Sequence, residues 1–227
     1  MDYESRLSLS RMQIREISKF VRKLLKIKTV KFPVLKALEM LIDKFPNNLY
    51  YRILPDDEFE VNVMAELVLE ENNVYYIKIR QTVYEKAVKG DRASLGFICH
   101  EMCHFILIHI FDAGPVLYKG ENGLTYARTL NDKELPRYKS MEWQAMALCG
   151  EIMIPYEKCK NYSFKQIVSI TESSNEQTKY FLKWVVKLEQ HNYYIKIKRS
   201  KSLQWFVLSK QYAIDEVLNK CLIAQLS

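Results

Sequence analysis

The sequence predicts an α+β protein in which the strands are confined to one stretch between helical segments. Residues 60 to 69 alternate between apolar and other side chains and lead through a Glu-Asn-Asn turn into a second β-rich run at residues 74 to 79. Residues 94 to 111 are apolar on nearly every side, which is typical of a helix inside a protein. The hydrophobic content of 48% and the charged content of 27% are ordinary for a soluble globular chain.

Two helices and a short strand are expected before this β-hairpin. Apolar residues recur at helical spacing among Lys and Arg over residues 8 to 28, which predicts a basic amphipathic helix. Pro33 suits the first turn of a second helix, which we expect to end near Lys44. A short strand is then expected at residues 49 to 54.

The middle of the chain is predicted to hold two apolar helices separated by a long loop. The first helix spans residues 94 to 111. Residues 112 to 139 contain several glycines, one of them before a proline, and show no periodicity, so we expect a loop there. The second apolar helix is expected from Met141 to Ile154, where Pro155 stops it.

The C-terminal third is predicted to contain a helix, a turn, an amphipathic helix, two basic strands and a last helix. This is the order of elements in a winged helix. The two helices are expected at residues 163 to 170 and 175 to 190, and the two strands at residues 193 to 199 and 203 to 208. We therefore divide the chain into an N-terminal basic helix at residues 1 to 32, a central domain at residues 33 to 156, and a C-terminal helical or winged-helix-like domain at residues 157 to 227.

Charge is unevenly distributed along the chain. Residues 1 to 36 carry 10 Lys and Arg against 3 Asp and Glu, and residues 156 to 227 carry 12 against 6. Residues 37 to 155 carry 12 against 18. The basic ends are suited to an acidic partner or to nucleic acid, although solvated helix faces produce the same pattern.

The chain is expected to be cytoplasmic. Its first residues mix both charges and lack the apolar block of a signal peptide, and no uncharged apolar stretch is long enough to predict a membrane span. The basic N-terminal helix allows contact with a membrane surface, but packing on the domain is the simpler interpretation. Reduced thiols are expected, because the cysteines are odd in number and form no CxxC pair. They are Cys99, Cys103, Cys149, Cys159 and Cys221.

One short motif indicates a metal site. His100, Glu101 and His104 fit the pattern HExxH within the apolar helix. Residues four apart lie on one face of a helix, so both imidazoles can bind one cation while Glu101 reaches a water molecule beside it. Buried histidines would otherwise need hydrogen-bond partners, which is the competing interpretation. His109 lies on another face and is not expected to be a ligand.

A catalytic zinc site needs a third protein ligand and one open position. We expect Glu142 to be this ligand. On its helix Gln144 and Glu151 share one face, whereas Glu142 lies opposite them with apolar residues that include Met146, so its carboxylate is expected to point into the interior. A solvated Glu near a helix start is the alternative. Three acidic residues of the preceding loop are rival ligands, namely Asp112, Glu121 and Glu134.

The two apolar helices together resemble the ImmA/IrrE-type metallopeptidases. In that family HExxH is followed by a helix that begins Glu-x-x-Ala and ends in an apolar-Met-apolar-Pro stop. The matching positions are His100, Glu101, His104, Glu142, Ala145, Met153 and Pro155. The resemblance covers roughly residues 33 to 156 and implies a zincin-like domain, with the HExxH helix under a small antiparallel sheet. It also implies that His100, His104 and Glu142 bind Zn²⁺ and that Glu101 is the catalytic base.

The predicted function is zinc-dependent hydrolysis of peptide bonds. By the resemblance, the substrate is a helix-turn-helix transcriptional repressor of a mobile element or a stress regulon. The basic C-terminal segment can contact DNA phosphates or an acidic face of such a repressor. The alternative is a DNA-binding or sensor regulator that has a zinc site and no peptidase activity.

A peptidase site also needs a peptide-binding element and a donor to the oxyanion. The edge strand of the hairpin can bind an extended peptide by strand addition, which would align it with the metal. A donor to the oxyanion is also expected, and the sequence does not choose among the candidates. These candidates are Tyr118, Tyr126, Arg128, Tyr138 and His191.

Overall fold

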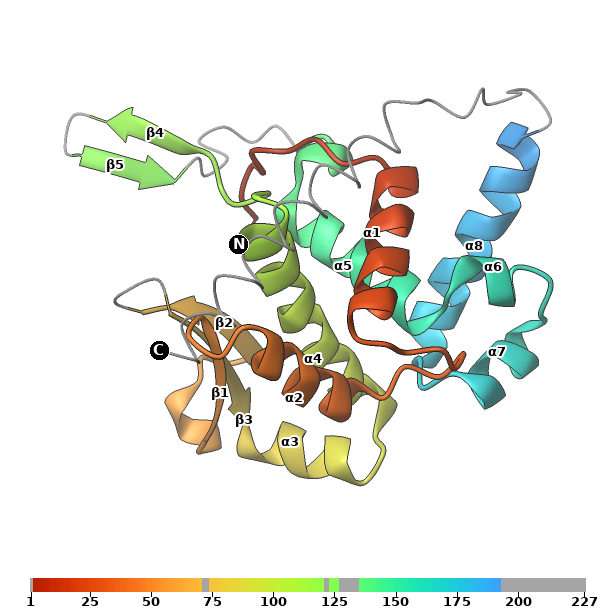
Figure 1. The fold of residues 1–227 in the computed structure, drawn as a ribbon, viewed down its shortest axis with the longest axis horizontal. Helices are drawn as coiled ribbons and strands as arrows, with labels where there is room; N and C mark the ends of the chain where they lie inside the picture. Colours follow the sequence, from red (N-terminus) through yellow and green to blue (C-terminus); the bar gives the residue numbers. More distant parts are fainter. Residues whose placement is uncertain (1, 71–73, 121–122, 127–134, 193–227) are drawn as a thin grey trace, which may run out of the picture.

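A computed structural model describes residues 2–70, 74–120, 123–126 and 135–192 of the chain. Its main helices and strands, in chain order, are α1 (Arg11–Leu24), α2 (Val34–Lys44), β1 (Leu49–Leu54), β2 (Ala65–Leu69), β3 (Tyr75–Arg80), α3 (Gln81–Val88), α4 (Arg92–Phe105), β4 (Leu117–Gly120), β5 (Gly123–Tyr126), α5 (Met141–Met153), α6 (Tyr156–Cys159), α7 (Phe164–Ile170) and α8 (Asn175–Asn192). Helix α4 lies between the small sheet and helix α5 (Figure 1). The α+β class predicted from the sequence is confirmed.

The small sheet has the strand order β1-β3-β2, so β2 is an edge strand. β2 and β3 form the predicted antiparallel hairpin, in which Leu67 lies opposite Ile77. β1 runs parallel to β3, so the expectation of an antiparallel sheet is wrong. A parallel neighbour requires a crossover connection, and here the chain crosses over through β2. The hairpin strand also begins at Ala65 rather than near residue 60, because Asn62 adopts a left-handed φ of 75° in a turn.

Helix α1 agrees with the predicted amphipathic helix. Ser10 caps its N-terminus through a capping box with Gln13. Its apolar residues Ile14, Ile17 and Val21 are fully buried, and the helix packs against α5. The apolar face of α1 therefore belongs to the protein core. This supports packing rather than membrane contact as the role of that face.

Helix α4 is the central buried helix predicted at residues 94 to 111. Asp91 caps it by accepting a hydrogen bond from the backbone N–H of Ser94. Beyond Phe105 it continues as a wider π-helical turn at Ile106–Ile110. Within the described part of the chain, the stretch Arg92–Ile110 alone is long and apolar enough to cross a membrane. Most of it is buried in the fold, however, and a buried core helix has the same composition.

Besides the short helix α6, two features of the fold were absent from the sequence prediction. Helix α3 follows β3 without a break, and its N-cap residue, Arg80, is the last residue of the strand. Part of the expected loop at residues 112 to 139 forms an antiparallel ribbon of β4 and β5, which projects from the body of the molecule (Figure 1). Both elements are short, and short elements carry little periodic signal.

The two helices predicted at the start of the C-terminal third are present as α7 and α8. The expected strands at residues 193 to 199 and 203 to 208 and the last helix lie outside the described residues. Buried Ile167 and Phe181 join the same cluster of core residues as α1, α4 and α5. The described C-terminal helices therefore share a hydrophobic core with the rest of the fold.

Candidate metal centre

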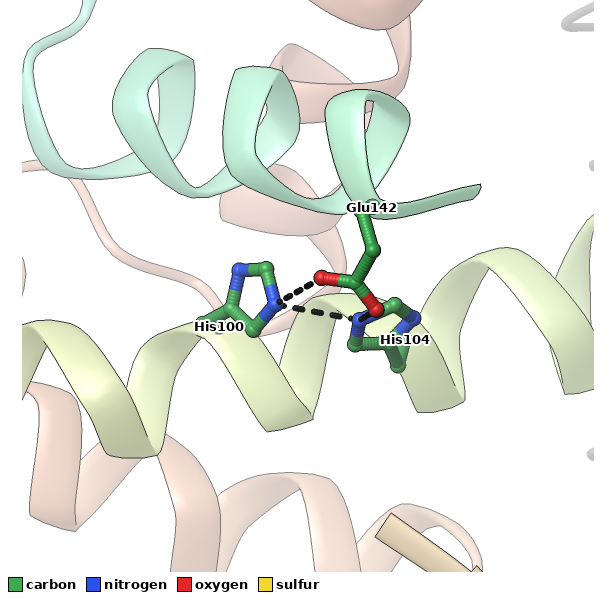
Figure 2. A group of neighbouring side chains, drawn as sticks. All are labelled: His100, His104 and Glu142. Atoms are coloured by element: carbon green, nitrogen blue, oxygen red, sulfur yellow. Dashed lines mark hydrogen bonds and ion pairs between the residues drawn. The ribbon is translucent and has the colours of Figure 1, made fainter. Parts of the chain in front are cut away.

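The candidate site lies between α4 and α5. His100 and His104 are one turn apart on α4 and face the start of α5 (Figure 2). Ser140 caps α5 by accepting a hydrogen bond from the backbone N–H of Trp143, which places Glu142 in the first turn. The two helices pack against each other, so the carboxylate of Glu142 reaches both imidazoles.

The three predicted ligand side chains form a compact triangle, in which each carboxylate oxygen of Glu142 contacts one imidazole. Nε2 of His100 lies 3.0 Å from Nε2 of His104 and 3.2 Å from Oε2 of Glu142. Nε2 of His104 lies 3.3 Å from Oε1 of Glu142. Tetrahedral zinc with bonds of about 2.0 to 2.1 Å separates its ligand atoms by about 3.3 Å. Each of these contacts is thus close to the spacing between two ligand atoms of such a tetrahedron, although the two contacts of Glu142 use different carboxylate oxygens.

Hydrogen bonds alone also produce contacts of this length, but they account less well for a closed triangle. An N–H group donates one nearly linear hydrogen bond, and two protonated Nε2 atoms facing each other would clash. Here each Nε2 atom faces both the other imidazole and the carboxylate of Glu142. One shared cation satisfies all three groups at once. The group of His100, His104 and Glu142 can therefore hold a metal ion.

The electrostatics of these groups are strongly coupled. Burial raises the pKa of Glu142, but hydrogen bonds with His100 and His104 and their charges outweigh burial and hold this pKa far below its usual range. Burial lowers the pKa of His100, whereas the hydrogen bond with Glu142 and the charge of Glu101 raise it, and the net change is upward. Glu142 is therefore ionised at neutral pH, as a metal ligand needs to be.

Glu101 lies beside the triangle without joining it. Its Oε2 accepts a hydrogen bond of 2.8 Å from the backbone N–H of Leu67 in the edge strand β2. Burial raises the pKa of Glu101, although the charges of His104 and His100 oppose this change. Sequence reasoning missed the contact with Leu67, because a backbone donor has no signature in residue types.

The position of Glu142 was predicted, but the reason given for it holds only in part. The face of α5 that carries Gln144 and Glu151 is buried too, with exposed fractions of 0% and 1%. On the side of Glu142, three of the apolar residues are buried as expected, namely Ala145, Cys149 and Met153. Met146, which was expected inside, is 55% exposed. Glu151 is buried because Arg11 and Arg15 of α1 form ion pairs with it. Glu142 lies in the first turn of α5 and faces α4, and its side chain is partly exposed instead of pointing into the core.

The other candidate residues are not part of the described cluster. Asp112 forms an exposed ion pair with Arg6 at 2.8 Å. His109 packs against Phe45, Phe105 and Tyr75, as expected for a histidine that does not bind metal. Tyr138 is 49% exposed. The rival ligands Glu121 and Glu134 and the donor candidate Arg128 lie outside the described residues, and so do the side chains of Tyr118, Tyr126 and His191.

Comparisons of the chain with protein-family models, with curated proteins and with solved structures find no significant match. The similarity to ImmA/IrrE-type metallopeptidases therefore stays a prediction from the HExxH motif and the helix that begins at Glu142.

Proposed function

We propose that the protein is a zinc-dependent endopeptidase of the ImmA/IrrE type with a zincin-like central domain. The observation that carries the proposal is the convergence of His100, His104 and Glu142 from two helices, with Glu101 placed beside them. Two imidazoles and one carboxylate are the ligand set of many catalytic zinc sites, and three protein ligands leave one position open. Imidazole ligands also favour zinc over calcium or magnesium, which prefer oxygen.

Zinc held by these residues would supply Lewis acidity, which lowers the pKa of water and polarises a peptide carbonyl. Glu101 would act as the general base. It takes a proton from the attacking water on its carboxylate and delivers it to the leaving nitrogen. Burial strengthens Glu101 as a base because it raises the pKa of the carboxyl group. The N–H of Leu67 holds one carboxylate oxygen and thereby orients the group.

The edge strand β2 is suited to bind an extended peptide. The hydrogen bonds between Arg80 N–H and Met64 C=O and between Glu70 N–H and Val74 C=O set the hairpin register. By alternation, the N–H and C=O groups of Ala65, Leu67 and Leu69 point towards the free edge. The N–H of Leu67 already contacts Glu101, which leaves five edge groups for a substrate. A complex with a substrate analogue that shows no main-chain pairing along β2 would contradict this binding mode.

The proposed substrate is a helix-turn-helix repressor, and the proposed location is the cytoplasm. Support for this substrate comes from the motif resemblance. The basic residues near the C-terminus would contact DNA or an acidic face of the repressor.

Zinc content and repressor cleavage test the proposal together. We expect one zinc per chain in the wild type and in Glu101→Gln, and a loss of zinc in Glu142→Ala, measured by elemental analysis after dialysis. Candidate repressors should be cleaved by the wild type and stay intact with Glu101→Gln. Glu39→Ala, at an exposed position on α2, is the control and should keep both properties.

Two results would overturn parts of the proposal. Full zinc retention in Glu142→Ala would remove Glu142 from the ligand set. Intact repressors with zinc-loaded wild type, together with salt-sensitive DNA binding, would instead support the regulator that has no peptidase activity.

A further inference from the structure

A cavity of about 440 Å³ lies away from the metal centre, at the other end of α5. It is formed by the C-terminal half of α1, the residues that follow this helix, and the segment from Pro155 to Lys158. Cavities of roughly 300 to 1,000 Å³ commonly hold small molecules. The size and concave shape of this cavity therefore suit the binding of a small molecule better than the binding of a macromolecule with a flat surface.

The residues around this cavity are strongly basic, although carbon atoms of their side chains and of the apolar residues form most of its wall. Seven of its twelve lining residues are Lys or Arg, and Glu157 is the one acidic residue among them. Glu157 already forms an ion pair with Lys160 at 3.1 Å and lies 4.0 Å from Lys19. The like charges around this cavity repel one another, and a bound anion would compensate them. The lining therefore carries a surplus of positive charge.

Several of these cations have no acidic partner in the described part of the chain. Lys23, Lys26 and Lys28 are exposed and take part in no ion pair that the described residues form. Arg22 donates to the carbonyl oxygen of Ile152 at 2.6 Å, and Lys158 donates to that of Lys28 at 2.6 Å. Backbone carbonyls orient these two groups and leave their charges uncompensated.

The backbone at Lys26 provides a second, independent observation. The N–H of Lys26 donates to Lys23 and the N–H of Ile27 donates to Arg22, so α1 ends in a Schellman motif. Lys26 occupies the left-handed position of this motif, with a φ of 53°. Glycine is the usual residue there, because a side chain strains this conformation. A lysine at this position strains the backbone and lowers the stability of the fold. Strained backbone conformations of this kind are often found at binding sites.

We propose that this cavity binds a small ligand with a di- or triphosphate group, of the nucleotide class. Several flexible lysines can surround a polyphosphate chain, and the buried charge of Arg22, whose guanidinium is held by backbone carbonyls, adds to the positive potential. Ile27 and Pro155 supply apolar wall for the uncharged part of the ligand. This site does not rest on the peptidase proposal, because none of its residues belongs to the metal centre.

Calorimetric titration of the full chain with ATP and with inorganic tripolyphosphate, without magnesium, tests the proposal. We expect binding that weakens with salt, and dissociation constants at least about tenfold higher for Lys23→Gln/Lys26→Gln. Lys36→Gln/Lys89→Gln removes two exposed lysines elsewhere and should bind as the wild type does. Glu142→Ala should also bind normally, which separates this site from chelation of a metal by the phosphates.

The variant Lys26→Gly distinguishes a loss of binding from a loss of folding. Glycine relieves the left-handed conformation, so this variant should be at least as stable as the wild type while binding either phosphate probe more weakly. Absence of binding at about 1 mM of both probes would overturn the proposal. Equal losses in both double variants, or binding confined to RNA or to anionic vesicles, would overturn it as well.

Discussion

The carboxylate of Glu101 is tied to the edge strand by the 2.8 Å hydrogen bond from the N–H of Leu67. This N–H points to the free edge of the sheet, where no strand among the described residues pairs with it. The proposed base is thus oriented by the strand that would also align a peptide substrate. A peptide that pairs along this edge would therefore lie next to the carboxylate of Glu101.

Leu67→Pro removes this one donor and leaves the pairing of β2 with β3 intact, because the N–H of Leu67 takes no part in it. A hydrogen bond to a charged group contributes about 1.5 to 3 kcal/mol. We therefore expect the rate of repressor cleavage to fall about tenfold or more, with an unchanged zinc content. Single-turnover cleavage and elemental analysis measure the two quantities.

Leu69→Pro is the matched control for this substitution. Its N–H also points to the free edge of β2, but no hydrogen bond joins it to Glu101. We expect the control to retain most of the cleavage rate. Equal rates for the two proline variants would show that the contact between Leu67 and Glu101 does not assist catalysis.

Metal removal is expected to destabilise the fold, because its proposed ligands come from both α4 and α5. A ligand present at about 1,000 times its dissociation constant stabilises the native state by about 4 kcal/mol, or about 10 °C in melting temperature at this chain length. Thermal unfolding with and without a chelator measures this difference. In Glu142→Ala the chelator should have little effect. An equal shift in the variant and the wild type would place the stabilising metal elsewhere.

Part of the candidate metal centre was predictable because spacing within one helix determines geometry. Residues four apart share a face, so His100 and His104 had to be neighbours once the helix was identified. Their packing against Glu142 is a contact between distant segments, and the prediction of Glu142 drew on the helix face it shares with apolar residues and on the family resemblance. The predicted hairpin likewise contains its own turn and pairing pattern.

The errors arose where partners lie far apart in sequence. Glu151 looked like a surface residue, since its burial depends on Arg11 and Arg15, more than 130 positions away. The parallel pairing of β1 with β3 also depends on a crossover that no residue pattern encodes. Local periodicity reports which face is apolar, but it does not report which charges a distant helix will neutralise.

The buried ion pairs of Glu151 lead to a stability prediction. Its side chain is 1% exposed, and it contacts Arg11 at 2.9 Å and Arg15 at 3.1 Å. Glu151→Ala removes the buried carboxylate that the two guanidinium groups share, so we expect a loss of about 3 to 5 kcal/mol in the free energy of unfolding. Urea denaturation measures the loss. Glu16→Ala breaks the exposed pair with Lys19 and should cost less than about 1 kcal/mol. Similar losses for both variants would contradict this assignment.

His109 is expected to make stability depend on pH. It stacks on Phe105, with ring centroids 5.0 Å apart, and also packs against Phe45 and Tyr75. Burial among these rings lowers the pKa of His109 in the folded state. The unfolded chain then binds a proton more readily than the folded chain does. The contribution of His109 is complete above its ordinary pKa of about 6.5 and declines as pH falls from there towards the lowered folded value.

His109→Phe removes this titration and keeps an aromatic ring in place. We expect the free energy of unfolding of the wild type to fall more steeply than that of the variant between about pH 7 and pH 5. Urea denaturation at a series of pH values gives both curves, and their difference isolates His109 from other groups that titrate in this range. Parallel curves would mean that the ring of His109 is protonated equally well in the folded protein, and the aromatic packing would then impose no penalty on its charge.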